Sequence, residues 1–207
     1  MKKELFTVRV DDYFPELCEI TIPTLKMYAE SIDAKFTVIE QRKYPEFSPT
    51  YEKMQIYELG AVNDYNILVD CDIAIKDGMY DVTELVEGRQ YGSWVEYYVG
   101  LNVCNDDILD VSTDRVPVTN FMVSTKESHS IWKPLTISKE EALIRMKRPF
   151  VIDEYCVGRN VKKFKMTHKA IIMPGADDNL FKHANITTDN KDISTVLSEL
   201  KNFISDE

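Results

Sequence analysis

The first forty residues alternate between two hydrophobic patterns. Residues 5–10 form a short apolar and β-branched run, which predicts a buried strand. Residues 16–32 repeat apolar side chains at helical spacing, and Pro23 within them predicts a kink or a break. Residues 35–39 return to a strand pattern. A strand, a helix and a second strand in this order are typical of an α/β domain.

The length and composition of the chain predict one folded domain. The 207 residues contain no repeat and no linker-like stretch, so a single domain spanning residues 1–207 is expected. Hydrophobic residues make up 44% of the chain, which is enough for a core. The net charge of −10 argues against nucleic-acid binding, because phosphate contacts call for a basic excess.

The cysteines and the start of the chain predict a cytoplasmic protein. The four cysteines are widely spaced and form no C-x-x-C pair, which predicts free thiols in a reducing compartment and no zinc cluster. Residues 1–8 enter a strand pattern directly, without the apolar stretch of a signal peptide. No run of about 18 apolar residues is present, so we expect no membrane span.

A strand that ends in two acids is the most informative motif. Residues 66–69 are Asn-Ile-Leu-Val, and Asp70, Cys71 and Asp72 follow. Ligands of an open α/β sheet bind beyond the carboxyl ends of its strands, and two uncompensated carboxylates there favour a cation. Oxygen ligands suit Mg²⁺ or Mn²⁺, which commonly also bind phosphate oxygens. The alternative interpretation is a solvated acidic turn.

The order of these motifs resembles a known family. Residues 50–59 predict a helix that carries Lys53, and the strand and the D-x-D motif at 70–72 come next. This arrangement resembles the GT-A glycosyltransferases, and the chain as a whole is similar to the small glycosyltransferases encoded by large algal viruses, the chloroviruses. The resemblance is strongest over residues 5–80. It implies a GT-A fold, in which helices flank a central, mixed but mostly parallel sheet.

The resemblance also implies an activity. Such an enzyme moves a hexosyl or deoxyhexosyl group from a nucleotide diphosphate sugar, here a UDP-sugar, to an acceptor hydroxyl of a glycan or glycoprotein. It depends on Mn²⁺ or Mg²⁺. For a viral protein the implied location is the host cytoplasm.

The same resemblance assigns residues to the nucleotide and the metal. Asp70 would lie near the ribose and the metal, and Asp72 would be the firmer metal ligand. Lys53 would approach the nucleotide or its phosphates, unless it is an exposed lysine that pairs with a neighbouring acid. The other residues that the resemblance places at the nucleotide sugar are Thr7, Val8, Arg9 and Cys71.

A histidine near the end of the chain is the third metal ligand that the resemblance implies. Many metal-dependent members of the fold complete the metal shell in this way, and His183 lies in the corresponding region. The glycine and the Lys-Pro-Trp that commonly follow this histidine are missing here. Lys182 is therefore the candidate for the phosphate contact. The alternative for His183 is an ordinary surface or core residue.

Two adjacent acids are candidates for the catalytic base. Sugar transfer with inversion needs a carboxylate to take the proton of the acceptor hydroxyl. Asp153 and Glu154 follow an apolar run and open a predicted helix, a place where inverting members of the family often carry this base. The alternative is that both acids complement the helix dipole. In that case a retaining reaction remains open.

Aromatic residues and one asparagine are candidates for the sugar site. Aromatic faces pack on sugar rings, so Trp94, Tyr97 and Tyr98 are candidate lining residues, with a core position as the alternative for Trp94. Asn120 falls on the strand that binds sugar in the family.

Three other functions compete with sugar transfer. A phosphohydrolase of the haloacid dehalogenase type also places D-x-D after a strand, and Asp177 and Asp178 resemble its late acids. That family, however, expects its motif at the start of the chain and Thr or Val at the position of Ala74. A nucleotidyltransferase expects a glycine-rich loop, which residues 9–13 lack. A non-catalytic sugar-nucleotide-binding domain is the third alternative.

Overall fold

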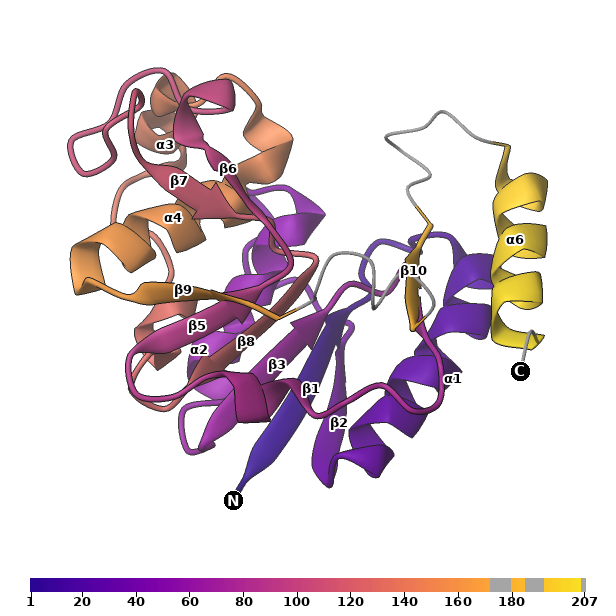
Figure 1. Ribbon diagram of the computed structural model, residues 1–207. Coiled ribbons are helices and arrows are strands. Elements are labelled where there is room, and N and C mark those ends of the chain that lie inside the picture. Colours follow the sequence, from indigo (N-terminus) through magenta and orange to yellow (C-terminus); the bar gives the residue numbers. More distant parts are fainter. Residues whose placement is uncertain (172–179, 185–191, 206–207) are drawn as a thin grey trace.

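A six-stranded sheet organises the fold (Figure 1), in the strand order β2-β1-β3-β8-β5-β9. The pairs β1–β2, β1–β3 and β5–β9 are parallel, whereas β8 is antiparallel to both β3 and β5. The expected mixed, mostly parallel sheet is confirmed. The strands are β1 (Lys3–Val8), β2 (Ala34–Ile39), β3 (Tyr65–Val69), β8 (Phe121–Thr125), β5 (Gln90–Ser93) and β9 (Thr167–Ala170). The computed structural model describes residues 1–171, 180–184 and 192–205.

The sheet buries a different apolar cluster on each face, because successive side chains of a strand point to opposite sides. Leu5 and Ile67 belong to the cluster that packs against helix α1, whereas their neighbours Phe6 and Leu68 belong to the cluster that packs under helix α4. The sheet is therefore flanked by helices on both faces, as expected. The α-helices are α1 (Pro15–Ser31), α2 (Ile56–Leu59), α3 (Lys139–Arg145), α4 (Ile152–Phe164) and α6 (Ile193–Ser205).

Short 3₁₀ turns take the place of several predicted helices. Residues 50–59 were expected to form one helix, but the chain makes a 3₁₀ helix η1 (Pro49–Gln55) and then the short α2. Further 3₁₀ turns are η2 (Val82–Leu85), η3 (Val99–Leu101), η4 (His129–Trp132) and η5 (Pro149–Val151). By contrast, α1 continues through Pro23. Pro23 is exposed, so the carbonyl that loses its helical partner there can be hydrated.

Two small sheets were not apparent from the sequence pattern. The segment 90–98 divides into β5 and β6 (Glu96–Tyr98), and β6 pairs antiparallel with β7 (Arg115–Pro117). In the other sheet β4 (Ile73–Ile75) pairs antiparallel with β10 (Phe181–His183).

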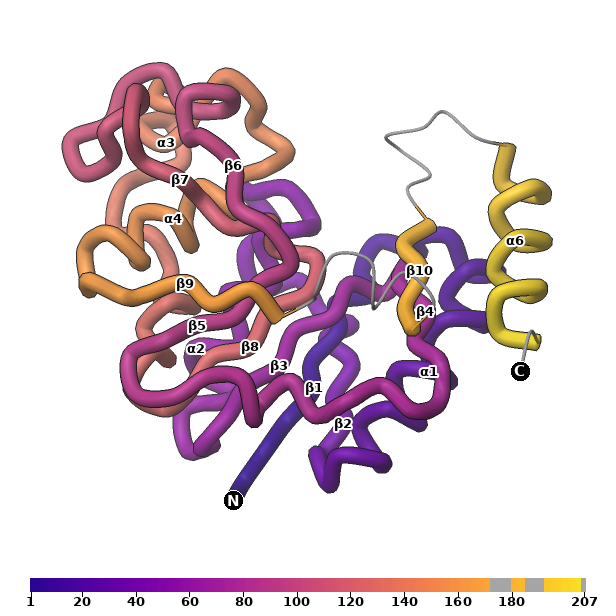
Figure 2. The backbone as a smooth tube through the Cα atoms, in the orientation of Figure 1, coloured from indigo at the N-terminus to yellow at the C-terminus, as the bar shows by residue number. Residues whose placement is uncertain are grey.

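The C-terminal segment packs beside the D-x-D motif (Figure 2). β10 lies along β4 with His183 opposite Ile73, and the N–H of Ala184 donates to the carbonyl of Asp72 over 2.9 Å. Helix α6 covers this pair from outside and packs on α1. The cluster that joins them contains Leu17, Ala74, Ala184, Val196 and Leu200. In the described parts of the chain no helix is long and apolar enough to cross a membrane.

Leu200→Ala is expected to loosen this C-terminal segment. Leu200 is fully buried in the cluster, and the loss of a buried leucine side chain lowers the free energy of unfolding by about 2–5 kcal/mol. Chemical denaturation measures this change, and hydrogen exchange should show faster opening of α6. Lys201→Ala, at an exposed position on the same helix, is the control. Equal stability of the two variants would contradict the packing described here.

Candidate active site

The candidate site forms where the ends of three central strands meet. Asp70 directly follows β3, and its N–H donates to the carbonyl of Asn120 over 2.7 Å, just before β8 begins. The pairing of the two strands begins directly beside this contact, because Val69 of β3 lies opposite Phe121 of β8. β1 runs parallel to β3 and also ends at this edge. The sheet thus places Asp70 and Asn120 next to each other beyond the carboxyl end of β3.

Lys53 occupies the centre of the site. Its ammonium Nζ lies 2.8 Å from Asp70 Oδ1 and 3.0 Å from Asp153 Oδ2, and it donates to the Thr119 carbonyl over 3.1 Å. The Thr119 hydroxyl also donates to Asp153 Oδ2, over 2.6 Å. The side chains of Lys53 and Asp153 are only 5% and 4% exposed. One buried ammonium therefore holds two carboxylates that come from β3 and α4.

The charges of this cluster shift the pKa values of its members. Burial alone would lower the pKa of Lys53, but the carboxylates of Asp70 and Asp153 outweigh it and raise that pKa. Burial would raise the pKa of Asp153, but Lys53 and the Thr119 hydroxyl bring it below its ordinary value. Lys53 is thus a permanent cation here. It does not pair with Glu52, whose carboxylate accepts hydrogen bonds from Arg42 and from backbone N–H groups.

Asp72 meets the C-terminal strand. Its Oδ1 lies 3.3 Å from His183 Nε2, and its Oδ2 accepts a hydrogen bond from the Tyr13 hydroxyl over 3.1 Å. The β4–β10 pairing brings the two side chains together, because His183 ends β10 beside the start of β4. Both side chains are partly open to solvent, at 13% and 19% exposure. They are accessible to a ligand.

The donor atoms of Asp72 and His183 fit a divalent cation. Two neighbouring ligands of an octahedral ion at about 2.1 Å lie about 3 Å apart, and the separation of 3.3 Å is close to this. A carboxylate oxygen and an imidazole nitrogen both suit Mn²⁺. Asp70 is held by Lys53 instead. In the described residues no group of three or more His, Cys, Asp or Glu side chains is placed to hold a metal ion, so the protein would supply two ligands here.

Glu154 has a different environment from its neighbour Asp153. Its Oε2 accepts a hydrogen bond from the Tyr97 hydroxyl, and it is only partly buried. Burial and the charge of Asp153 raise the pKa of Glu154 to about 7, although the Tyr97 bond acts in the opposite direction. Two adjacent acids at the start of α4 therefore have pKa values displaced in opposite directions.

Other predicted residues lie around this centre with partners of their own. Arg9 is exposed and pairs with Glu40 over 2.8 Å. Cys71 is buried against the thiol of Cys18 on α1. Trp94 is partly buried; it packs edge to face on Phe181, against the apolar cluster on the α1 side. Lys182 lies 3.3 Å from Glu199 of α6. Thr7 and Val8 end β1 at the edge of the site, and Thr7 is fully buried.

Sequence reasoning missed several partners of these residues. Tyr13 contacts Asp72, and Thr119 contacts both Lys53 and Asp153. Tyr13 could have been found, because it follows the first strand at the edge where ligands bind. Thr119 lies in an irregular segment before β8 and carried no comparable signal. All four cysteines are free, as expected. Asp177 and Asp178 lie outside the described residues.

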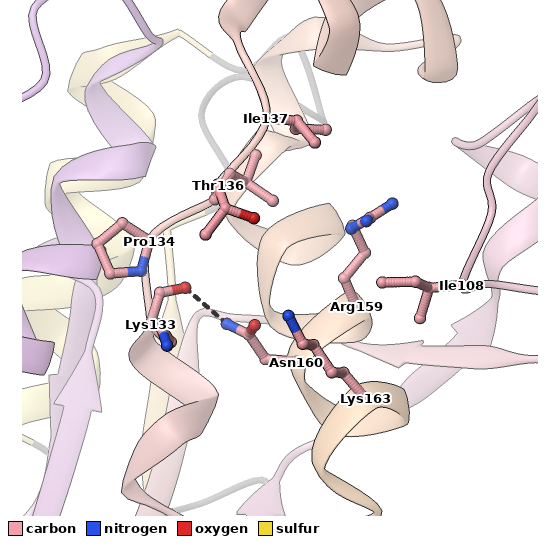
Figure 3. Close-up of a pocket in the computed structure, with 9 residues that line it drawn as sticks. Ile108, Lys133, Pro134, Thr136, Ile137, Arg159, Asn160 and Lys163 are labelled. Carbon is pink, nitrogen blue, oxygen red and sulfur yellow. Dashed lines mark hydrogen bonds between the residues drawn. The ribbon is translucent and has the colours of Figure 1, made fainter.

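The crevice beside α4 is separate from this cluster (Figure 3). It lies between the segment around Pro134 and helix α4, where the Asn160 amide donates to the Lys133 carbonyl over 2.7 Å. Its volume is about 20 Å³, which suffices for about one water molecule. Its lining residues include neither Lys53 and Asp72 nor the side chains that contact these two residues.

Comparison with solved structures identifies the fold as GT-A, the fold of nucleotide-diphospho-sugar transferases. The expected resemblance to a chlorovirus enzyme is confirmed in the fold. A glycosyltransferase involved in the glycosylation of the major capsid of PBCV-1 superimposes with a TM-score of 0.61. The alignment covers 97% of this chain and 99% of that one, at 11% sequence identity.

Two galactosyltransferases have the same architecture. LgtC, in complex with donor and acceptor sugar analogs, gives a TM-score of 0.54 at 10% identity, over 99% of this chain and 97% of that chain. The catalytic domain of Drosophila β1,4-galactosyltransferase 7, in complex with xylobiose, gives 0.51 at 10% identity, over 100% and 82%. No protein-family model and no curated protein sequence matches the chain.

Lys53→Met is expected to destabilise the fold strongly. It removes the cation between Asp70 and Asp153 and leaves both carboxylates without their ionic partner, and breaking a buried ion pair costs about 3–5 kcal/mol. Chemical denaturation at pH 7 measures this loss. Lys43→Met removes an exposed ion pair with Glu58 and should change stability little.

The destabilisation should depend on pH. In the wild type the pKa of Asp153 is depressed below 3.8, so ionised Asp153 contributes stability above that pH and the contribution is lost as the pH falls through the depressed value. In Lys53→Met the carboxylates should bind protons more readily. The difference in free energy of unfolding between the variant and the wild type should therefore become smaller in acid. A gap that stays constant from neutral to acid pH would contradict the cluster described here.

Proposed function

We propose that the chain is a metal-dependent glycosyltransferase that uses a nucleotide diphosphate sugar, a UDP-sugar by resemblance. The observation that carries the proposal is the meeting of Asp72 and His183 beside Asp70, at the carboxyl edge of a GT-A sheet. This is the edge at which open α/β sheets bind ligands. The acceptor is a hydroxyl of a glycan or glycoprotein, and the transferred group is a hexosyl or deoxyhexosyl unit.

Asp72 and His183 would hold Mn²⁺ or Mg²⁺ through Oδ1 and Nε2, and Asp70, engaged by Lys53, would lie beside the metal. When bound, the metal neutralises the diphosphate and stabilises the leaving nucleotide diphosphate. The Tyr13 hydroxyl keeps Asp72 oriented through its bond to Oδ2. The end of β1, with Thr7, Val8 and Arg9, faces the same edge and would receive the nucleoside.

Polar groups beside the metal residues would recognise the donor. The amide oxygen of Asn120 is buried without a hydrogen-bond partner among the described residues, and an unpaired buried acceptor is costly. A hydroxyl of the donor would satisfy it. Cys71 and Trp94 would shape the wall of the site through their packing. Lys182 is partly exposed beside His183. It would bind a phosphate of the donor if its ion pair with Glu199 opened.

The two acids at the start of α4 would have different roles. The charge of Asp153 is balanced by Lys53, and its carboxylate also accepts a hydrogen bond from Thr119, so Asp153 would act as a fixed group that positions the donor side of the site. Glu154 has a pKa of about 7, which suits a general base near neutral pH. It would take the proton of the acceptor hydroxyl, and transfer by this route inverts the configuration of the sugar.

Asp72→Ala is expected to abolish metal-dependent binding of UDP. The substitution removes one of the two metal donors and the partner of His183. Calorimetry with UDP and Mn²⁺ should show no heat beyond that seen without the metal. Asp77→Ala, in the exposed turn after β4, is the matched control and should bind like the wild type. Normal Mn²⁺-dependent binding by Asp72→Ala would exclude this metal site.

Glu154→Gln is expected to stop transfer while UDP binding is retained. The amide preserves the shape of the side chain but cannot accept a proton, and loss of a general base costs about 10²- to 10⁴-fold in rate. Asp153→Asn should instead weaken both binding and stability, because it breaks the contact with Lys53. Release of UDP from UDP-sugars measures the rate. Wild-type turnover by Glu154→Gln would exclude it as the base.

A phosphatase assay separates this proposal from the phosphohydrolase alternative. The carboxylate of Asp70 would be the nucleophile of such an enzyme, but it is engaged by Lys53. We therefore expect no turnover of a generic phosphoester with Mg²⁺ by the wild-type chain. Robust turnover that disappears in Asp70→Asn would overturn the assignment to sugar transfer.

A further inference from the structure

A chain of side-chain hydrogen bonds leads to Glu154 from outside helix α4. The amide Nδ2 of Asn102 donates to the Tyr97 hydroxyl oxygen over 2.7 Å, and this hydroxyl donates to Glu154 Oε2. Tyr97 lies on β6, and Asn102 directly follows the turn η3. These hydrogen bonds therefore connect the β6–η3 segment to the first turn of α4.

The direction of these hydrogen bonds is set by their donors. An amide nitrogen can only donate, so the phenol oxygen accepts from Asn102 and its single proton is left for Glu154. A donor aimed at a carboxylate favours the ionised acid. The bond also engages Oε2, so that Oε1 is the oxygen available to an acceptor hydroxyl. The arrangement both favours the ionised form of Glu154 and fixes its orientation.

The position of Asn102 indicates that this series of hydrogen bonds is not a by-product of packing. Asn102 is 8% exposed, and its Oδ1 is buried without a partner among the described residues. An unpaired buried amide oxygen is unfavourable, so an apolar residue would suit this position better on stability alone. The amide is held here with Nδ2 directed at Tyr97.

The surroundings of Glu154 explain why such a donor matters. Burial and the charges of Asp153 and Asp70 disfavour ionisation of Glu154, whereas the Tyr97 hydroxyl and the Lys53 ammonium favour it. Lys53 is already shared between Asp70 and Asp153. Among these groups Tyr97 is the one that contacts Glu154 directly.

We propose that Tyr97 and Asn102 are positioning residues that favour the ionised form of Glu154 and direct its free oxygen toward the acceptor. The inference rests on the proposed function, in which Glu154 is the base. It adds a structural unit, the β6–η3 segment, on which the reactivity of an acid on α4 depends. It also makes a prediction about the titration of Glu154 that does not require knowledge of the acceptor.

The first test is a carbon-13 NMR titration of the Glu154 carboxyl group, assigned with Glu154→Gln. Tyr97→Phe should raise the pKa of Glu154, so that the ratio of ionised to protonated acid at pH 7 falls about tenfold. Asn102→Leu, which leaves the phenol in place, should raise it less. Tyr65→Phe, at the opposite end of the sheet on β3, should leave it unchanged.

The second test is the pH dependence of donor turnover. In Tyr97→Phe the acid limb of the kcat profile should move to higher pH while the affinity for UDP stays at the wild-type value. An unchanged Glu154 titration in both Tyr97→Phe and Asn102→Leu would overturn the positioning role and leave the proposed function standing. Wild-type turnover by Glu154→Gln would overturn the base itself, and the positioning role with it.

Discussion

The structure depends on one buried ammonium shared by two carboxylates. Lys53 stands 17 residues from Asp70 and 100 residues from Asp153 in the sequence, yet it contacts both. It also binds the carbonyl of Thr119. These contacts join the 3₁₀ helix η1, the end of β3, the approach to β8 and the start of α4. Ionised groups are costly to bury unless they are paired and hydrogen-bonded, so the four segments have little freedom to separate.

The pairing also determines what the two aspartates of the D-x-D motif can do. Asp70 faces inward to Lys53, whereas Asp72 faces Tyr13 and His183. A single residue, Cys71, lies between them and is buried against α1. The motif therefore connects two environments, one that is internally neutralised and one that is open to a cation. The C-terminal strand β10 is essential to the second, because it supplies His183.

Local patterns in the sequence predicted the parts of the fold that are themselves local. The β1–α1–β2 unit follows from hydrophobic periodicity, and Asp70 and Asp72 follow from an apolar strand that ends in acid. Strands β7 and β10 have three residues each, too few to show a period. The partners of Lys53 could not be predicted, because a contact across 100 residues leaves no trace in local spacing. His183 was predicted only from a resemblance, and its contact with Asp72 depends on the β4–β10 register.

The adjacent acids of α4 show how one helix start can serve two purposes. Asp153 faces the Lys53 ammonium and the Thr119 hydroxyl, which lower its pKa. Burial and the charge of Asp153 raise the pKa of Glu154 to about 7, although the hydrogen bond from the Tyr97 phenol lowers it. Pairs of acids whose environments displace their pKa values in opposite directions are typical of sites in which one acid stays ionised and the other exchanges a proton. The sequence Asp-Glu alone suggested two equivalent candidates. Their opposite environments arise because consecutive residues of a helix face different neighbours, and this asymmetry makes Glu154 the stronger candidate for proton transfer.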